Sequence, residues 1–248
     1  MRIPVLEARV DRKLLILFST DPVVLANRVP PGRELRLQKD RAILYVQLTR
    51  YEKVRVVPAP IGISFDEVAY YIALEPLVPK KSHECRDQVI RVESGSAAHV
   101  QLARVLRSCE ITRVHFSSRE SASDLDVNGF SGRGEILFAL RGQQVPAFLP
   151  GLLFQGLPSV AEFFEWKLTP TGYEPNLPAP WPYRSKGTEY RCFPFDVTRF
   201  TSAFLESERH FPVGAFVLDH ALWLRRVAGQ WESAPERVAS RNLQPTWA

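Results

Sequence analysis

The chain has 248 residues, of which 45% are hydrophobic and 24% are charged, a composition that excludes a disordered or fibrous protein. The length fits one large β-rich domain, and we expect a single domain over residues 1–248 with a mobile tail from about residue 233. The formal net charge of +5 comes from arginines spread along the chain rather than gathered in a patch, so it disfavours a nucleic-acid interface.

The cysteines and the apolar runs indicate the cellular setting. Cys85, Cys109 and Cys192 are odd in number and lack the spacing of a zinc site, so they are expected to be free thiols in a reducing compartment. No apolar run approaches the roughly 18 residues of a membrane span, and no secretory signal is recognisable. We therefore expect a cytoplasmic protein without a membrane partner, a metal or another cofactor. The sequence leaves the oligomeric state open, a homo-oligomer included.

The first part of the chain predicts strands joined by proline turns. Residues 13–20 (KLLILFST) are an almost wholly apolar run, typical of a strand buried on both faces. Asp21 and Pro22 then supply the N-cap and the first position of a short helix, which residues 29–32 (VPPG) bring to an end.

A hairpin and a long strand follow. Residues 34–38 and 41–51 predict a hairpin around Lys39 and Asp40, in which one face of the second strand carries Ile43, Tyr45, Gln47 and Thr49. Residues 65–75 (FDEVAYYIALE) give the strongest strand pattern, because β-branched and aromatic residues alternate along them. One face of that strand would carry Glu67, Ala69, Tyr71 and Ala73.

The middle of the chain combines a strand, a helix and another strand. After a polar loop at 78–86, residues 88–93 predict a strand and residues 96–106 an amphipathic helix, capped by Ser94 or Ser96. His99 is expected on the solvent side of this helix. A turn at residues 108–110 (SCE) leads into a strand at 111–117.

The second half is more irregular. We first expect an acidic loop at 122–129, a strand at 134–141, an irregular apolar segment at 145–160 and a strand at 163–170. A proline-rich connector at 173–194 is expected to lie over the body of the protein. A helix capped by Asp196 and a bent strand or strand pair at 212–227 would follow. The whole pattern predicts an α+β, mainly β, fold. Its core would be a closed or curved antiparallel β-barrel with a few helices packed outside.

The order of elements in the first half resembles that of the acetoacetate decarboxylase superfamily. The resemblance rests on RKLLILF, STDPVVLANRVPPGREL, RAILYVQL, DEVAYYIAL and the helix-turn-strand at 93–119, and it covers about residues 10–140 well. Near the C-terminus, VGAFVLDHALWLRRVAGQWES is similar to the uncharacterised branch of the superfamily. The resemblance implies a closed barrel whose apolar cavity binds a small-molecule ligand, either apolar or carboxylate-bearing.

The resemblance also bears on catalysis. Enzymes of the superfamily form a Schiff base with a keto acid through a lysine in a Pro-Lys-Lys turn after the helix, but residues 108–110 contain no lysine. A barrel without the covalent chemistry is therefore the leading hypothesis. A lyase using Lys80 or Lys81, which lie one strand earlier, is the alternative; two solvated lysines are the simpler interpretation of that pair. A protein-interaction module that presents the connector is a second alternative.

Several further residues are candidates for the site. Glu67 would be a partly desolvated acid or base if its face lines the barrel, and a solvated carboxylate otherwise. The candidate ligand-binding residues are Tyr71, Arg104, His115 and Asp219. His115 could point inward or to solvent, whereas an inward Asp219 would need Arg225 or Arg104 as a partner, which favours a structural ion pair. No His or Cys pair has metal-binding spacing, and no Gly-x-Ser-x-Gly elbow indicates a hydrolase.

Overall fold

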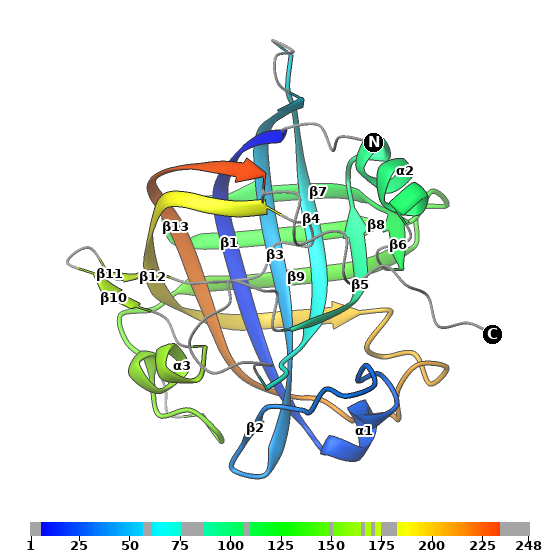
Figure 1. Ribbon diagram of the computed structural model, residues 1–248, viewed down its shortest axis with the longest axis vertical. Helices are drawn as coiled ribbons and strands as arrows, with labels where there is room; N and C mark the ends of the chain where they lie inside the picture. Colours follow the sequence, from blue (N-terminus) through cyan, green and yellow to red (C-terminus); the bar gives the residue numbers. More distant parts are fainter. Residues whose placement is uncertain are drawn as a thin grey trace.

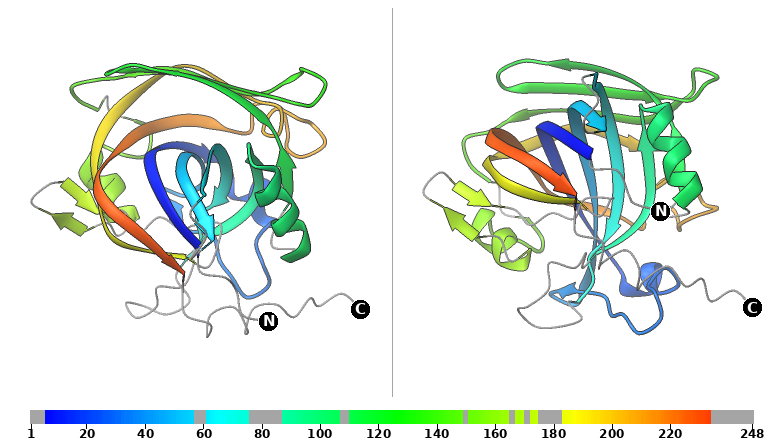
Figure 2. Two further views of the ribbon diagram at one scale, coloured as in Figure 1. Left: turned by 90° about the horizontal axis from the view of Figure 1, so that it is seen from above. Right: turned by 45° about the horizontal axis from the view of Figure 1, so that its top comes forward.

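The computed structural model describes residues 6–56, 61–75, 87–106, 110–148, 151–164, 167–169, 172–174 and 183–233. One sheet curves into a nearly closed barrel, with the strand order β6-β5-β4-β3-β1-β13-β12-β9-β8-β7 (Figures 1 and 2). Strand β2 pairs with β3 beside this path, and β10 and β11 form a separate two-stranded sheet. The prediction of a mainly β barrel with a few helices is confirmed.

The central strands come from the first third of the chain. They are β1 (Leu6–Thr20), β3 (Arg41–Val56), β4 (Ile63–Ile72) and β5 (Gln88–Ser94), each antiparallel to its neighbour. Between them, α1 (Pro22–Ala26) begins as predicted, because the Val23 N–H donates to the Asp21 side chain. The short strand β2 (Leu37–Gln38) turns into β3 through Lys39 and Asp40, whose φ angles of 47° and 60° suit a tight hairpin.

A single continuous segment closes the barrel. After α2 (Ala97–Leu106), the chain forms β6 (Ile111–Arg113) and runs directly into β7 (His115–Glu120). The first of these strands pairs in parallel with β5, and the second pairs antiparallel with β8 (Asp124–Phe130). Between them, the Val114 N–H donates to the Ser94 carbonyl at 3.0 Å. Residues 111–120 therefore form both ends of the sheet.

Two loop predictions in this region are wrong. The acidic segment at 122–129 lies largely in β8, because Leu125 and Val127 alternate with polar residues and are buried. The segment at 145–160 is not wholly irregular, since α3 (Leu157–Phe163) begins within it and buries Val160 and Ala161. The strand β9 (Ile136–Gln144) corresponds to the strand expected at 134–141.

The last part of the chain departs most from expectation. After β10 (Lys167–Thr169) and β11 (Gly172–Glu174), the described chain resumes with β12 (Tyr183–Ser202) and ends with β13 (Val217–Ser233). The helix predicted from Asp196 is wrong, as is the loop expected for 183–194. Strand β12 pairs first with β13 and then with β9, so backbone hydrogen bonds to two neighbours outweigh the local helical pattern.

Alternation along the central strands divides the core between two faces of the sheet. In Figure 1, β7, β8 and β9 lie behind β1, β3 and β4. We call the face toward them the back face; its side chains, such as Leu14, Val46 and Val68, pack with Val127 and Phe138. The opposite, front face packs against residues 153–163 and contributes Leu15, Leu17, Tyr45, Tyr71 and Leu222. Every central strand is therefore buried on both sides.

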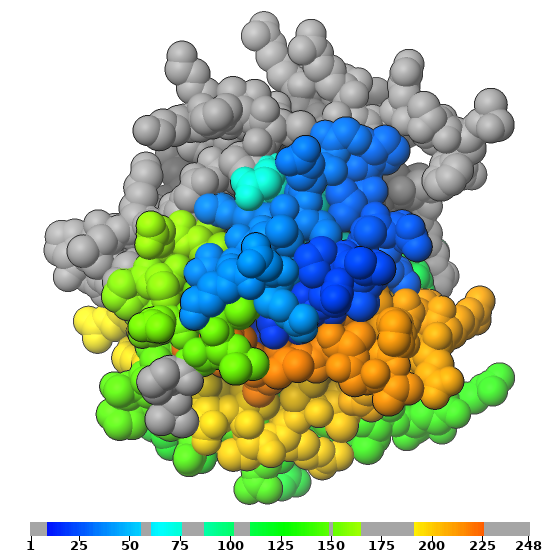
Figure 3. Space-filling model, turned by 90° about the horizontal axis from the view of Figure 1, so that it is seen from below, coloured from blue at the N-terminus to red at the C-terminus, as the bar shows by residue number. Residues whose placement is uncertain are grey.

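The lower end of the molecule is covered by α1 with the loop after it, by residues 151–163, and by the segment between β12 and β13 (Figure 3). Arg28 Nη2 donates to the His210 carbonyl at 3.1 Å, and Lys39 Nζ donates to the Leu152 carbonyl at 3.1 Å. These two hydrogen bonds hold the loop after α1 against the segment between β12 and β13, and the β2–β3 hairpin against residues 151–163. The polar groups described next lie higher up, about midway along the central strands.

Candidate ligand-binding site

Four polar side chains form a row across the front face. Strand register places Lys13 of β1 opposite Thr49 of β3, Thr49 opposite Glu67 of β4, and Glu67 opposite Ser94 of β5. We call these four residues the polar row. None is more than 2% exposed, although two of them are ionisable. Burying a charge is costly unless it is paired and hydrogen-bonded, so the groups around the row decide what it can do.

Helix α2 places His99 over the polar row. The His99 N–H donates to Ser96 Oγ at 3.1 Å, which caps the helix and fixes its rotation about its axis. The ring Nδ1 of His99 then lies 2.8 Å from Glu67 Oε2 and 3.2 Å from Ser94 Oγ, with the side chain only 9% exposed. The prediction that His99 faces solvent is therefore wrong, because α2 docks with this side chain toward β4 and β5.

Lys13 is the most unusual group of the site. Burial lowers its pKa to about 8, while the negative charge of Glu67 acts in the opposite direction. An amine with this pKa is partly neutral near neutral pH and can act as a nucleophile, whereas its charged form attracts an anion. Lys13 and His99 are two basic side chains near the carboxylate of Glu67. A site with two basic side chains can attract an anion.

Gln47 extends the polar surface toward the lower end of the sheet. It lies opposite Leu15 on one side and Ala69 on the other, and its side chain is 1% exposed. Gln47 Nε2 donates to Thr49 Oγ1 at 3.1 Å, which orients the amide. Gln47 and Thr49 share one face of β3, as alternation along the strand predicts.

Aromatic and aliphatic side chains surround these polar groups. The Phe65 ring lies 5.7 Å from the His99 ring and 5.2 Å from the Tyr51 ring. Farther along the same face, Tyr71 stacks on Tyr45 with ring centroids 4.8 Å apart, and Tyr45 OH donates to Asp87 at 2.6 Å. Tyr71, a candidate ligand-binding residue, is fully buried in this packing. It lies on the same face of β4 as Glu67, four residues farther along the strand.

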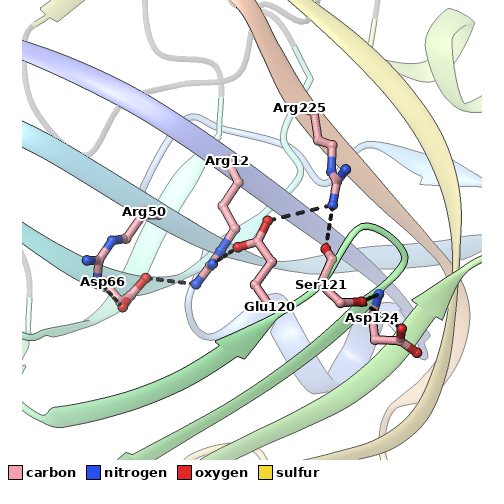
Figure 4. Close-up of polar contacts among 7 residues, drawn as sticks. All are labelled: Arg12, Arg50, Asp66, Glu120, Ser121, Asp124 and Arg225. Atoms are coloured by element: carbon pink, nitrogen blue, oxygen red, sulfur yellow. Dashed lines mark hydrogen bonds and ion pairs between the residues drawn. The ribbon is translucent and has the colours of Figure 1, made fainter.

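A network of ion pairs lies directly behind the polar row, on the back face (Figure 4). Asp66, the neighbour of Glu67, accepts from Arg12 Nη2 at 3.0 Å and from Arg50 Nη1 at 2.7 Å. Arg12 and Asp66 are at most 4% exposed. Because Arg12, Arg50 and Asp66 are sequence neighbours of Lys13, Thr49 and Glu67, their pairing holds the three strands in the register that builds the site.

The hairpin between β7 and β8 joins this network. Glu120, the last residue of β7, pairs with Arg12 and lies 3.7 Å from Arg225 of β13. Arg225 also donates to the Ser121 carbonyl at 3.1 Å (Figure 4). Arg225, one of the two partners expected for Asp219, therefore binds Glu120 and Ser121 instead.

Asp219 is buried but has other partners than the arginines expected. A β-bulge between Leu17 and Phe18 of β1 leaves Asp219 outside the register, beside His220. Asp219 Oδ2 lies 2.6 Å from His220 Nδ1, and Oδ1 accepts from the Leu153 N–H at 2.8 Å. Burial acts to raise the pKa of Asp219, but these hydrogen bonds bring it below its ordinary value. Asp219 thus anchors residues 151–154 to β13.

The other residues singled out in the sequence lie away from the polar row or outside the described residues. His115 is exposed at the start of β7. Lys80, Lys81 and the side chain of Arg104 lie outside the part of the chain that the structure describes. Cys192 is a free thiol whose pKa burial raises to about 12, so it is protonated and unreactive at neutral pH.

Two kinds of feature are absent from the described residues. Their His, Cys, Asp and Glu side chains include no group of three placed to hold a metal ion. Within the same ranges, no helix has the length and apolar character needed to cross a membrane.

Lys13 is the residue that sequence reasoning missed. The signal was present, because a run predicted to be buried on both faces begins with this lysine, and Lys13 alternates in phase with Leu15 and Leu17. A charge in such a position has to be paired within the protein or with a ligand.

Comparison with known proteins identifies the fold. No family model and no curated protein matches the chain. Among solved structures, an acetoacetate decarboxylase matches with a TM-score of 0.54 and 10% identity, over 94% of this chain and 90% of that one. The acetoacetate decarboxylase of Legionella pneumophila gives 0.53 and 10%, over 92% and 88%. The enduracididine biosynthesis enzyme MppR, complexed with pyruvate, gives 0.51 and 11%, over 94% and 89%.

Proposed function

Since the chain has the acetoacetate decarboxylase-like fold, we propose that it binds a small carboxylate-bearing molecule on its front face, at Lys13, Glu67 and His99. The observation that carries the proposal is the burial of Lys13, which is 2% exposed and lies in the same row as Glu67, the carboxylate that His99 contacts. The ammonium form of Lys13 would attract a ligand carboxylate in surroundings that exclude water. MppR, one of the structures of similar fold, is complexed with pyruvate, a carboxylate of this size.

The surroundings of Lys13 support tight binding of such a group. Electrostatic attraction is stronger where water is excluded, and Leu15, Leu224 and Ala69 flank the polar row with at most 1% exposure. A short hydrocarbon chain on the ligand would contact these side chains. The fold holds the basic groups on strands and on a capped helix, so little ordering is required on binding.

Calorimetric titration with pyruvate and with propanoate tests the proposal. The variant Lys13→Met removes the charge and keeps an apolar chain of similar length, and we expect it to weaken binding by at least about tenfold. Lys53→Met, at an exposed position of β3, is the matched control and keeps wild-type affinity. Unchanged affinity in Lys13→Met would rule out the front-face site.

A second candidate function is covalent chemistry at Lys13, and the pKa of about 8 is what favours it. The neutral amine would attack the carbonyl carbon of a bound oxo acid, and loss of water would leave a Schiff base. Borohydride treatment in the presence of pyruvate, followed by intact mass and peptide mapping, tests this. A reduced adduct on Lys13 supports it, and an adduct on Lys80 or Lys81 supports the original lyase alternative. No adduct removes both and leaves the binding proposal standing.

The protein-interaction alternative has less support. It requires residues 173–194 to be an exposed connector, whereas residues 183–194 are part of β12 and pair with β13.

A further inference from the structure

Three buried acceptor atoms near the polar row are without hydrogen-bond partners among the described residues. They are Gln47 Oε1 and both carboxylate oxygens of Glu67, on side chains that are each 1% exposed. Glu67 Oε2 still lies 2.8 Å from His99 Nδ1, within ion-pair distance, which leaves Gln47 Oε1 and Glu67 Oε1 with neither kind of contact. Leaving a buried acceptor unpaired costs about 1–3 kcal/mol. Two such atoms on one face of the sheet therefore indicate that a bound molecule supplies their hydrogen-bond donors.

The positions of these atoms relate them to the proposed site. Gln47 is the diagonal neighbour of Lys13 across β1 and β3, and of Glu67 across β3 and β4. Diagonal neighbours of this kind lie about 7–8 Å apart in an antiparallel sheet. A molecule whose carboxylate pairs with Lys13 would therefore reach Gln47 with a group only a few atoms away.

The orientation of Gln47 defines which group is missing. Its Nε2 is already engaged with Thr49 Oγ1, so the free atom is the carbonyl oxygen, which only accepts hydrogen bonds. Glu67 Oε1 is likewise an acceptor when the carboxyl is ionised. Both unpartnered atoms thus call for a donor, and a purely apolar acid would leave them buried and unpaired.

We infer that the ligand carries a hydrogen-bond donor, a hydroxyl or an N–H group, a few carbon atoms from its carboxylate, and that Gln47 Oε1 accepts from it. This inference rests on the proposed function and narrows its ligand to short hydroxy or amino carboxylic acids. Lys13 and His99 recognise the carboxylate, while Gln47 selects against the acid of equal length that lacks the donor.

Matched pairs of acids test the inference on the full chain. Calorimetry at neutral pH compares propanoate with 3-hydroxypropanoate, butanoate with 4-hydroxybutanoate, and pentanoate with 5-hydroxypentanoate. In at least one pair the hydroxy acid should bind about tenfold tighter, the value of one hydrogen bond to a buried acceptor. Gln47→Met keeps the side-chain length without the acceptor and should reduce that preference to less than about twofold. Gln143→Met, at an exposed position of β9, should preserve it.

The outcomes separate this inference from the proposed function. Equal affinities within every pair overturn the inference and leave carboxylate binding in place, because a trapped water would then satisfy Gln47. A preference that persists in Gln47→Met also overturns it, since another residue must accept the bond. If neither pyruvate nor any of the six acids binds, the proposed function is removed as well. If Gln47→Met does not fold, the wild-type pairs still decide whether the site prefers a ligand with a donor, and Gln47→Glu, which keeps an acceptor, should retain that preference.

Discussion

The ionisation of Lys13 links the site to the stability of the whole protein. In the folded state this amine loses its proton near pH 8, because burial disfavours the ammonium form, while in the unfolded chain it keeps its proton up to about pH 10.5. Glu67 limits the shift but does not cancel it. Below about pH 8 the folded protein contains a buried ammonium group, which lowers its stability; above that pH the amine is neutral and this cost disappears.

This difference predicts an unusual pH dependence. Between pH 8 and 10.5 unfolding takes up a proton at Lys13, so the free energy of unfolding rises with pH across that window. The gain for wild type relative to Lys13→Met should reach about 3 kcal/mol at the upper end. Urea unfolding of both proteins at several pH values measures it, and Lys53→Met should follow wild type. A constant difference between wild type and Lys13→Met would contradict the lowered pKa.

Residue-level prediction from the sequence succeeded where alternation along a strand was sufficient. The shared face of Gln47 and Thr49 and that of Glu67 and Ala69 follow from a two-residue period, which the structure keeps. It failed for His99, because the direction of a helical side chain depends on how the helix docks. Only the tertiary arrangement brings α2 over β4 and β5.

At the scale of elements, close contact between strands decides what can be substituted. Gly142 of β9 lies where a Cβ atom would come within 2.2 Å of the Asp196 carbonyl and 2.4 Å of the Phe195 ring. Both neighbours belong to β12, which pairs with β9 at this point. The absence of a side chain at Gly142 thus allows β12 to cross from β13 to β9.

Gly142→Ala should therefore destabilise the protein by at least about 2 kcal/mol, because the backbone carbonyl cannot move without disrupting the ladder. Gly132→Ala is the matched control: nothing lies within 4 Å of its added Cβ, and stability should change by less than about 0.5 kcal/mol. Chemical denaturation of both variants measures the two effects. Equal stabilities would show that β9 and β12 are not packed as described.

The same crossing explains why the sequence misled at this element. Residues 196–206 carry an N-cap signal and helical spacing, and nothing local reveals that residues 195–202 pair with β9. By contrast, α1 and the Lys39-Asp40 hairpin were predictable because a cap and a tight turn depend on adjacent residues. A cap and a tight turn could be recognised from adjacent residues, whereas the pairing of residues 195–202 with β9 could not.

For the whole molecule, closure depends on residues 111–120. Val114, at the junction of β6 and β7, is fully buried and donates a hydrogen bond to Ser94, the last residue of β5. Val114→Pro removes the N–H, so β5 and β8 should lose amide exchange protection together. Val114→Ala keeps the N–H and loses only side-chain packing, so any loss of protection should not be concentrated at these two strands. Loss at one strand alone in the proline variant would contradict a shared closing segment.

The shared segment also bears on how the protein behaves at high concentration. An open sheet offers two rows of unpaired backbone groups, and such rows are templates for joining one molecule to the next. Here one stretch of chain serves as both borders, with β6 only three residues long and β7 carrying charged residues such as Arg119 and Glu120. Opening that stretch would expose both borders at once, so barrel closure and resistance to aggregation are the same property of this chain.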